Sequence, residues 1–298
     1  PAPRSPLPSF RINVLHITGK CCNYCRSLTT IHHPQHMALE LKIGWLYPTL
    51  MSTYGDRGNV IAIQQRAQWR GINVEVIPYD RDSHPDIIHQ VDVIAGGGAQ
   101  DRQQEIVMRD LAGAKAEAIK AKLDAGAPGV FTCGSPQLLG RFYEPGLGEK
   151  IEGMGIIDLE TKHPGIDTQR YIGNVVFEIT AKRLTAELTR MLGGQKPIIV
   201  GFENHGGRTY LGPNAEALGK VIKGYGNNAT DGTEGAFYHN AIATYSHGPL
   251  IPKNPFIADW MIKTALQNKY QTEIDLAPLD DSLADRARAA ILKRLEIN

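Results

Sequence analysis

The sequence has few cysteines, no long apolar run and almost no net charge. No stretch approaches the about 18 uninterrupted apolar residues that span a bilayer, so we expect no membrane insertion. A formal net charge of +1 gives no electrostatic reason for binding nucleic acid or an anionic membrane. The first residues show neither an apolar h-region nor a small-residue cleavage site, which argues against secretion. We therefore expect a cytoplasmic protein.

The four cysteines are distributed unevenly. Cys21, Cys22 and Cys25 crowd near the start, whereas Cys133 stands alone. This spacing does not resemble a disulfide framework, and a cytoplasmic protein keeps its thiols reduced. Adjacent cysteines with irregularly spaced histidines also fit no common zinc motif, so we predict no metal site. Packing or chemistry must therefore explain Cys133.

Two regions differ in composition. Residues 1–38 are rich in Pro, His and Cys without a sustained period, and we interpret them as a poorly structured N-terminal extension. In residues 39–298, short apolar runs alternate with amphipathic stretches, and we expect one domain that ends in a helix. Strand–helix–strand order with Gly-rich turns predicts an open, mostly parallel α/β sheet covered by helices. Short strand candidates after residue 150 are expected to extend that sheet.

The segment GVFTCGSPQLLG, residues 129–140, resembles a nucleophile elbow. A buried strand ends at Cys133, Gly134 permits a sharp turn, and Pro136 suits the first turn of a helix. Such a turn exposes the sulfur at the carboxyl end of the sheet, where open α/β folds place their sites. The helix start stabilises negative charge and offers backbone N–H groups to an oxyanion. The alternative is a buried structural cysteine, so the elbow alone does not decide.

A cysteine nucleophile needs a base, normally a histidine. Two histidines end strand candidates and are followed by glycine: His205 in FENHGGRTY and His247 in ATYSHGPLIPKN. Either could reach a cleft, and spacing does not choose between them. A third feature, AGGGAQDRQQE at 95–105, reads as an oxyanion loop, or as a phosphate cradle or a plain turn. Because it lacks G-x-G-x-x-G and GK[ST], a nucleotide site is not expected.

Taken together, these motifs resemble the class I (triad-type) glutamine amidotransferases, and within them the CobB/CobQ-like branch. The resemblance begins near Leu41 and weakens after the helix expected at 254–270. It is most specific to the glutaminase subunits of bacterial lipid II isoglutaminyl synthases. The motifs that carry it are YGDRGN at 54–59, the GGG loop, CG-x-x-QLLG, GFENHGGRTYLG at 201–212, GYGNN at 224–228 and TYSHGPLIPKN at 244–254. It implies a flavodoxin-like sheet.

The resemblance also implies roles for individual residues. Cys133 matches the nucleophile and His247 the general base, which leaves His205 in a family loop. Arg170 matches an arginine implicated in holding glutamine, which implies a bidentate pair with the α-carboxylate. Gln137 borders the glutamine pocket. The oxyanion is expected to accept hydrogen bonds from the N–H of Gly134 and from the N–H of either Gly97 or Gly98.

Two departures from the family pattern affect these roles. Many class I enzymes have a Glu two residues after the histidine, but here that position is Pro249. The third carboxylate is then expected from a partner subunit or, as the weaker choice, from Glu203. The usual CGGYQ reads CGSPQ, so residues 135 and 136 are expected to shape the pocket differently.

The function implied is hydrolysis of L-glutamine to glutamate and ammonia. The ammonia would pass to a MurT-like Mur ligase in a heterodimer, which would use ATP and Mg to amidate D-glutamate of lipid II. No cofactor is expected in this chain. The alternatives are another acceptor such as cobyrinate, or a non-catalytic binding module with the same fold.

Overall fold

In a computed structural model, residues 38–165, 167–247 and 250–297 are described. The predicted extension and the cysteines at 21, 22 and 25 lie outside them, as does Pro249. The helices are α1 Arg57–Gln68, α2 Asp101–Leu111, α3 Ala114–Asp124, α4 Gly134–Leu139, α5 Lys182–Met191, α6 Leu250–Lys253, α7 Pro255–Tyr270 and α8 Ser282–Arg294, with a 3-10 helix η1 at Pro85–Gln90. The strands are β1 Glu40–Leu46, β2 Asn73–Tyr79, β3 Val93–Gly96, β4 Gly129–Thr132, β5 Phe142–Glu144, β6 Ile151–Glu152, β7 Leu159–Lys162, β8 Tyr171–Ile179, β9 Ile198–His205, β10 Arg208–Leu211, β11 Gly219–Lys223, β12 Thr233–Glu234, β13 Ala236–Tyr238, β14 Ala241–Thr244 and β15 Ser246–His247.

The main sheet has the strand order β13-β14-β4-β3-β1-β2. Five of its strands run parallel, and only the edge strand β13 is antiparallel. The predicted open, mostly parallel α/β sheet is therefore confirmed. Because β1, β3, β4 and β14 are parallel, the segments that follow them meet at one edge of the sheet.

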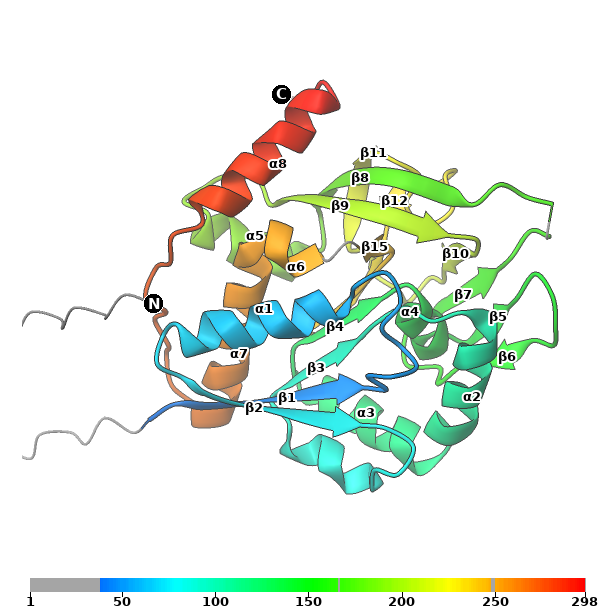
Figure 1. Cartoon of the computed structure of the whole chain (residues 1–298), viewed down its shortest axis with the longest axis horizontal. Coiled ribbons are helices and arrows are strands. Elements are labelled where there is room, and N and C mark those ends of the chain that lie inside the picture. The colour runs from blue at the N-terminus through cyan, green and yellow to red at the C-terminus, as the bar shows by residue number, and fades with distance from the viewer. Residues whose placement is uncertain (1–37, 166, 248–249, 298) are drawn as a thin grey trace, which may run out of the picture. The chain divides into compact units, whose positions relative to one another are not determined.

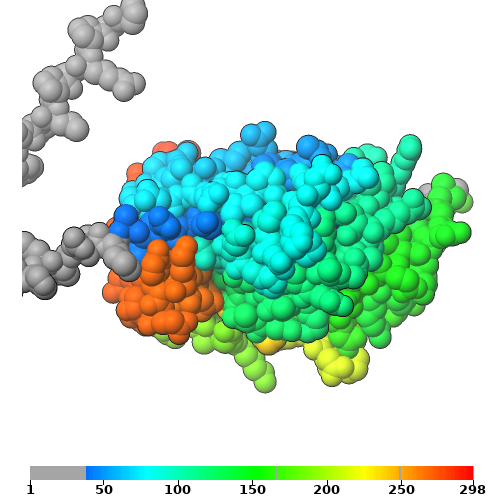
Figure 2. Space-filling view, turned by 90° about the horizontal axis from the view of Figure 1, so that it is seen from below, coloured from blue at the N-terminus to red at the C-terminus, as the bar shows by residue number. Residues whose placement is uncertain are grey.

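Helices cover both faces of the main sheet (Figure 1). Along β3, Val93 and Ala95 belong to the apolar cluster that contains α1 and α7, whereas Ile94 belongs to the cluster that contains α2 and α3. This alternation follows from the period of two in a strand. Figure 2 shows the second face from outside, where η1, α2 and α3 form much of the surface.

The second half departs from the expectation in its sheet assignment. Only β13 and β14 join the main sheet, while the other strands form a four-stranded sheet, β10-β7-β5-β6, and a five-stranded sheet, β12-β11-β8-β9-β15. The strand segments were predicted, but their partners were not, because alternation fixes a strand's faces and not its neighbours. The β8–β9 pair is the long twisted ribbon beside the main sheet in Figure 1.

Residues 101–124 form two helices, α2 and α3, rather than one. Gly113, at φ 76, separates α2 from α3 and adopts a backbone conformation that favours glycine. α2 lies next to the residue that follows Cys133, because its Gln104 would be 3.2 Å from a Cβ added to Gly134. α3 packs against the main sheet, because its Ile119 belongs to the same apolar cluster as Ile94. In the described ranges, none of the helices is both long and apolar enough to span a bilayer.

Candidate active site

The elbow has the predicted form. β4 ends at Thr132, Cys133 follows with φ 55 and ψ −98, and α4 starts at Gly134. A positive φ at a non-glycine residue is strained, and such strain is typical of a nucleophile at a strand-to-helix turn. The Cys133 N–H donates to the carbonyl of Thr244 at 2.8 Å, which ties the elbow to the neighbouring strand β14.

His247 lies beside Cys133, and its ring is held by Asp56. The Nδ1 atom is 3.0 and 3.1 Å from the two carboxylate oxygens of Asp56. Both residues are buried, and the imidazole also interacts with the Cys133 sulfur. The Nε2 atom has no hydrogen-bond partner within the described ranges. With Nδ1 donating to Asp56, Nε2 is the ring atom available for proton exchange with Cys133.

The electrostatics favour a charged imidazole. Burial lowers the pKa of His247, but the charge of Cys133 and the hydrogen bond to Asp56 outweigh this effect. The pKa rises from its ordinary 6.5 to about 10. The arrangement therefore favours a charged imidazole beside Cys133, which is the setting in which a cysteine nucleophile is activated.

Asp56 corrects the expected source of the third carboxylate. It comes from this chain's own YGDRGN loop between β1 and α1, and not from Glu203. The Glu203 carboxylate instead accepts the N–H groups of Tyr225 and Gly226 at 2.7 and 2.9 Å. The signal that could have found Asp56 is its position, because it follows a parallel strand at the same sheet edge as Cys133.

Gly98 packs against Cys133, His247 and Asp56. A Cβ added to Gly98 would lie 3.0 Å from Cε1 of His247, and 3.3 Å from both Oδ2 of Asp56 and Cβ of Cys133. Its N–H donates to Asp56 at 2.8 Å, and its carbonyl accepts the N–H of Thr53 at 3.1 Å. The loop 53–56 thus binds both the N–H and the carbonyl of Gly98.

These contacts remove one of the expected oxyanion donors, Gly98, and leave Gly97 and Gly134 as predicted. Because the N–H of Gly98 is already bound to Asp56, it is not free for an oxyanion. Gly97 lies in the same loop, where its carbonyl accepts the hydroxyl of Ser135 at 2.7 Å. The backbone N of Ala99 is also close to the elbow, since it would be 3.0 Å from a Cβ added to Gly134. Tight packing between this loop and the elbow explains why position 134 is glycine.

A cavity of about 350 Å³ opens next to Cys133. This volume suits a small molecule such as an amino acid. Besides Cys133, it is lined by Tyr54, Ala99, Gln100, Asp101, Gln104, Gln137, Tyr143, Arg170, His205, Gly206 and Gly207. The structure therefore brings the two residues predicted to bind glutamine, Arg170 and Gln137, into one cavity with the nucleophile.

Contacts orient both of these residues. Arg170 donates from Nε and Nη2 to Asn204 Oδ1 at 3.1 Å each, and Nη2 also donates to the Asn204 carbonyl. These bonds use Nε and Nη2, and no hydrogen bond of Nη1 is found in the described ranges. Gln137 donates from Nε2 to the Tyr245 hydroxyl at 3.1 Å. Its Oε1 has no partner in the described part of the chain.

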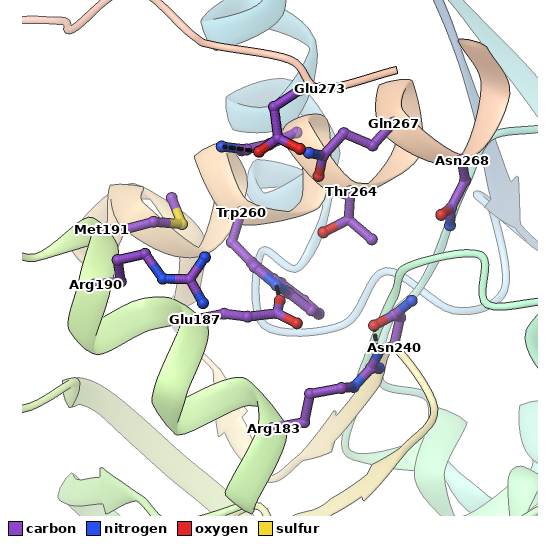
Figure 3. A pocket seen from close by; sticks show the side chains of 11 residues that line it. Arg183, Glu187, Arg190, Met191, Asn240, Trp260, Thr264, Gln267, Asn268 and Glu273 are labelled. Carbon is purple, nitrogen blue, oxygen red and sulfur yellow. Dashed lines mark hydrogen bonds and ion pairs between the residues drawn. The ribbon is translucent and has the colours of Figure 1, made fainter. Parts of the chain in front are cut away.

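A larger cavity of about 500 Å³ lies between α5 and α7 (Figure 3). Trp260 donates its indole N–H to Glu187 there, and Arg183 points toward Asn240. Asn240 comes just before β14, whereas His247 comes shortly after it. This cavity therefore lies at the other end of β14 from His247. The residues that line it include no nucleophile beside a base, so the cavity next to Cys133 is the candidate active site.

Comparisons with known proteins agree with this geometry. Residues 42–255 match the CobB/CobQ-like glutamine amidotransferase domain. The chain is 36% identical over 230 residues to the lipid II isoglutaminyl synthase (glutamine-hydrolyzing) subunit GatD of Staphylococcus aureus (strain N315), covering 77% of this chain and 86% of the relative. The GatD subunit of Streptococcus pneumoniae (strain ATCC BAA-255 / R6) is 34% identical over 245 residues, covering 82% and 88%. A chain in the structure of PurLQS from Thermotoga maritima shares the fold, with a TM-score of 0.50, 15% identity, and coverage of 79% of this chain and 100% of that one.

Proposed function

Because this chain belongs to the CobB/CobQ-like glutamine amidotransferase family, we propose that it is the glutaminase subunit of a lipid II isoglutaminyl synthase. It hydrolyses L-glutamine to glutamate and ammonia. The observation that carries this proposal is the Cys133–His247–Asp56 constellation at an elbow, beside a cavity of amino-acid size.

The reaction is an acyl transfer in two stages. The Cys133 thiolate attacks the side-chain amide carbon of glutamine, and the backbone N–H groups of Gly134 and Ala99 stabilise the tetrahedral oxyanion. His247 gives its proton to the departing nitrogen, so ammonia leaves and a γ-glutamyl thioester remains. His247 then takes a proton from water, whose oxygen attacks the thioester and releases glutamate and the thiolate.

Asp56 acts in this scheme as a positioning residue. It accepts the Nδ1–H of His247, which aims Nε2 at the sulfur and stabilises the imidazolium. It also accepts the N–H of Gly98, so it links the position of the base to the position of the loop that carries Ala99. The triad is therefore complete within this chain, and no carboxylate from a partner is needed for it.

The partner in this proposal is a MurT-like Mur ligase. Two relatives are each named a subunit of a lipid II isoglutaminyl synthase, which supports assembly with a second subunit. That subunit would use ATP and Mg to activate the D-glutamate carboxyl of lipid II for attack by ammonia. In this proposal the chain works in the cytoplasm without membrane insertion of its own.

Glutamate release by the co-expressed pair tests the proposal. We expect Cys133→Ala to abolish glutamine hydrolysis, whereas Cys25→Ala, a matched control outside the described residues, keeps it. Hydrolysis that survives in Cys133→Ala would refute the assignment of the nucleophile. To test the acceptor, the pair is given lipid II or cobyrinate with ATP and ¹⁵N-amide glutamine. We expect ¹⁵N in lipid II, and label in cobyrinate alone would contradict the proposed acceptor.

A further inference from the structure

We propose that Asp101 binds the α-ammonium group of the substrate, so that the cavity recognises a free, zwitterionic amino acid. This inference rests on the proposed glutaminase function and adds a specificity residue to it. Apart from the catalytic sulfur, the cavity lining carries two side chains with a formal charge, Asp101 and Arg170. One anion and one cation complement the α-ammonium and α-carboxylate of glutamine.

The Asp101 carboxylate is held with one oxygen free. It begins α2, and its Oδ1 accepts the hydroxyl of Tyr143 at 2.9 Å. Tyr143 comes from β5 and is itself buried, so this bond fixes the carboxylate at the cavity wall. The Oδ2 atom has no hydrogen-bond partner in the described ranges. A charge-assisted bond from an ammonium to this oxygen is therefore available without breaking a protein contact.

Both charges line this cavity and act on one neighbouring residue, His163. Burial lowers the pKa of His163, the charge of Asp101 opposes this effect, and the charges of Arg208 and Arg170 add to it. One imidazole therefore experiences both the anion and the cation. Since Arg170 keeps its Nη1 free while Asp101 keeps its Oδ2 free, both can hold the two charged groups on a single α-carbon.

The neighbouring acceptors support an ammonium rather than a second anion. An ammonium group has three N–H donors and needs several acceptors. Gln104 and Gln137 line the same cavity at 2% and 3% exposure, and each has an Oε1 atom without a partner in the described part of the chain. Gln104 lies one turn after Asp101 on the same face of α2. Buried acceptors without donors are costly and mark a place where a donor binds.

A consequence is exclusion of glutamine within a peptide. An N-acylated glutamine has no ammonium group, and its carbonyl would face Asp101. The site would thus hydrolyse free glutamine and leave glutamine residues of proteins intact. A substrate without an ammonium group would leave the Asp101 carboxylate unpaired, and such a loss discriminates strongly between substrates.

The test compares L-glutamine with glutaramic acid, which has the same side-chain amide and carboxylate but no α-amino group. Both are given to the co-expressed pair as wild type, Asp101→Asn and Glu105→Gln. Glu105 is an exposed residue of α2 paired with Arg109, so it is a matched control. We expect Asp101→Asn to lower kcat/KM for L-glutamine about tenfold, mainly through KM, and to leave glutaramic acid unchanged. Glu105→Gln should change neither.

Two results would overturn the inference, and they are distinguishable. An equal loss on both substrates in Asp101→Asn, or no loss on either, would show that Asp101 does not recognise the ammonium, while the glutaminase function stands. No hydrolysis of L-glutamine by the wild-type pair would instead overturn the proposed function together with this inference.

Discussion

Two histidines end neighbouring strands of one sheet, and each lies near a buried carboxylate. His247 ends β15 and is next to Asp56, whereas His205 ends β9 and lies 3.7 Å from Glu203. Both rings are 1% exposed. Their pKa values nevertheless shift in opposite directions, because burial lowers the pKa of each and only His247 has charges that outweigh it.

The difference lies in how the carboxylates are used. Glu203 is satisfied by two backbone N–H groups, and Nδ1 of His205 contacts the carbonyl of Gly207 at 2.8 Å. That ring also stacks on Tyr245, with a centroid distance of 3.8 Å, and is neutral. The Asp56 carboxylate accepts a single backbone N–H in the described ranges, from Gly98, and both of its oxygens also contact the imidazole of His247. A buried histidine beside a carboxylate therefore acts as a base only where the carboxylate oxygens contact its imidazole ring.

The largest expected contrast is between the two histidines themselves. His247→Asn should lower kcat/KM for glutamine about 10³-fold, because proton transfer to the leaving nitrogen is lost. His205→Asn should lower it less than about tenfold, since that residue only lines the cavity. Steady-state glutaminase assays check both. A comparable loss in the two variants would remove the distinction drawn between the histidines.

The packing around Gly98 gives the next contrast. Gly98→Ala would press a methyl group against His247 and Cys133, and we expect kcat to fall about 10- to 100-fold. Gly173→Ala is the matched control, because a Cβ there meets nothing within 4 Å. Unchanged kcat in Gly98→Ala would show that the three residues are not constrained by this glycine.

Stability as a function of pH should separate the histidines as well. For His247 the folded pKa, about 10, lies above the unfolded 6.5, so its contribution is complete below pH 6.5 and disappears as pH rises toward 10. For His205 the folded pKa lies below 6.5, so its contribution is present above pH 6.5 and is lost as pH falls below it. The free energy of unfolding, measured with urea, should therefore stop falling at alkaline pH in His247→Asn. Its fall at acid pH should be smaller in His205→Asn. The reverse assignment of these two effects would contradict the shifts.

The smallest effect on activity is expected at Glu203. Glu203→Gln would place an amide where two backbone N–H groups need acceptors, and should lower the free energy of unfolding by about 1–3 kcal/mol. The value of kcat should stay within about threefold of wild type. Thermal melting and the glutaminase assay measure these separately, and a large loss of kcat without a loss of stability would restore Glu203 as a candidate catalytic carboxylate.

Much of the site could be predicted from local sequence. An apolar run that ends at Cys133 before a glycine is enough for the elbow, and alternation within β3 and β4 gives the covered sheet. Asp56 could not be assigned this way, because its partner His247 is 191 positions away and only the strand order brings them together. The same reason applies to the later strands, whose segments were evident while their division into separate sheets was not.

This chain supplies its own third carboxylate, Asp56. The most direct test is the glutaminase kcat of Asp56→Asn in the co-expressed pair, with Glu203→Gln measured in parallel. We expect kcat to fall about 10²- to 10⁴-fold in Asp56→Asn, with both subunits still co-purifying, because the imidazole loses its orienting anion. A kcat within about threefold of wild type in Asp56→Asn would contradict the claim and return the search for the carboxylate to the partner subunit.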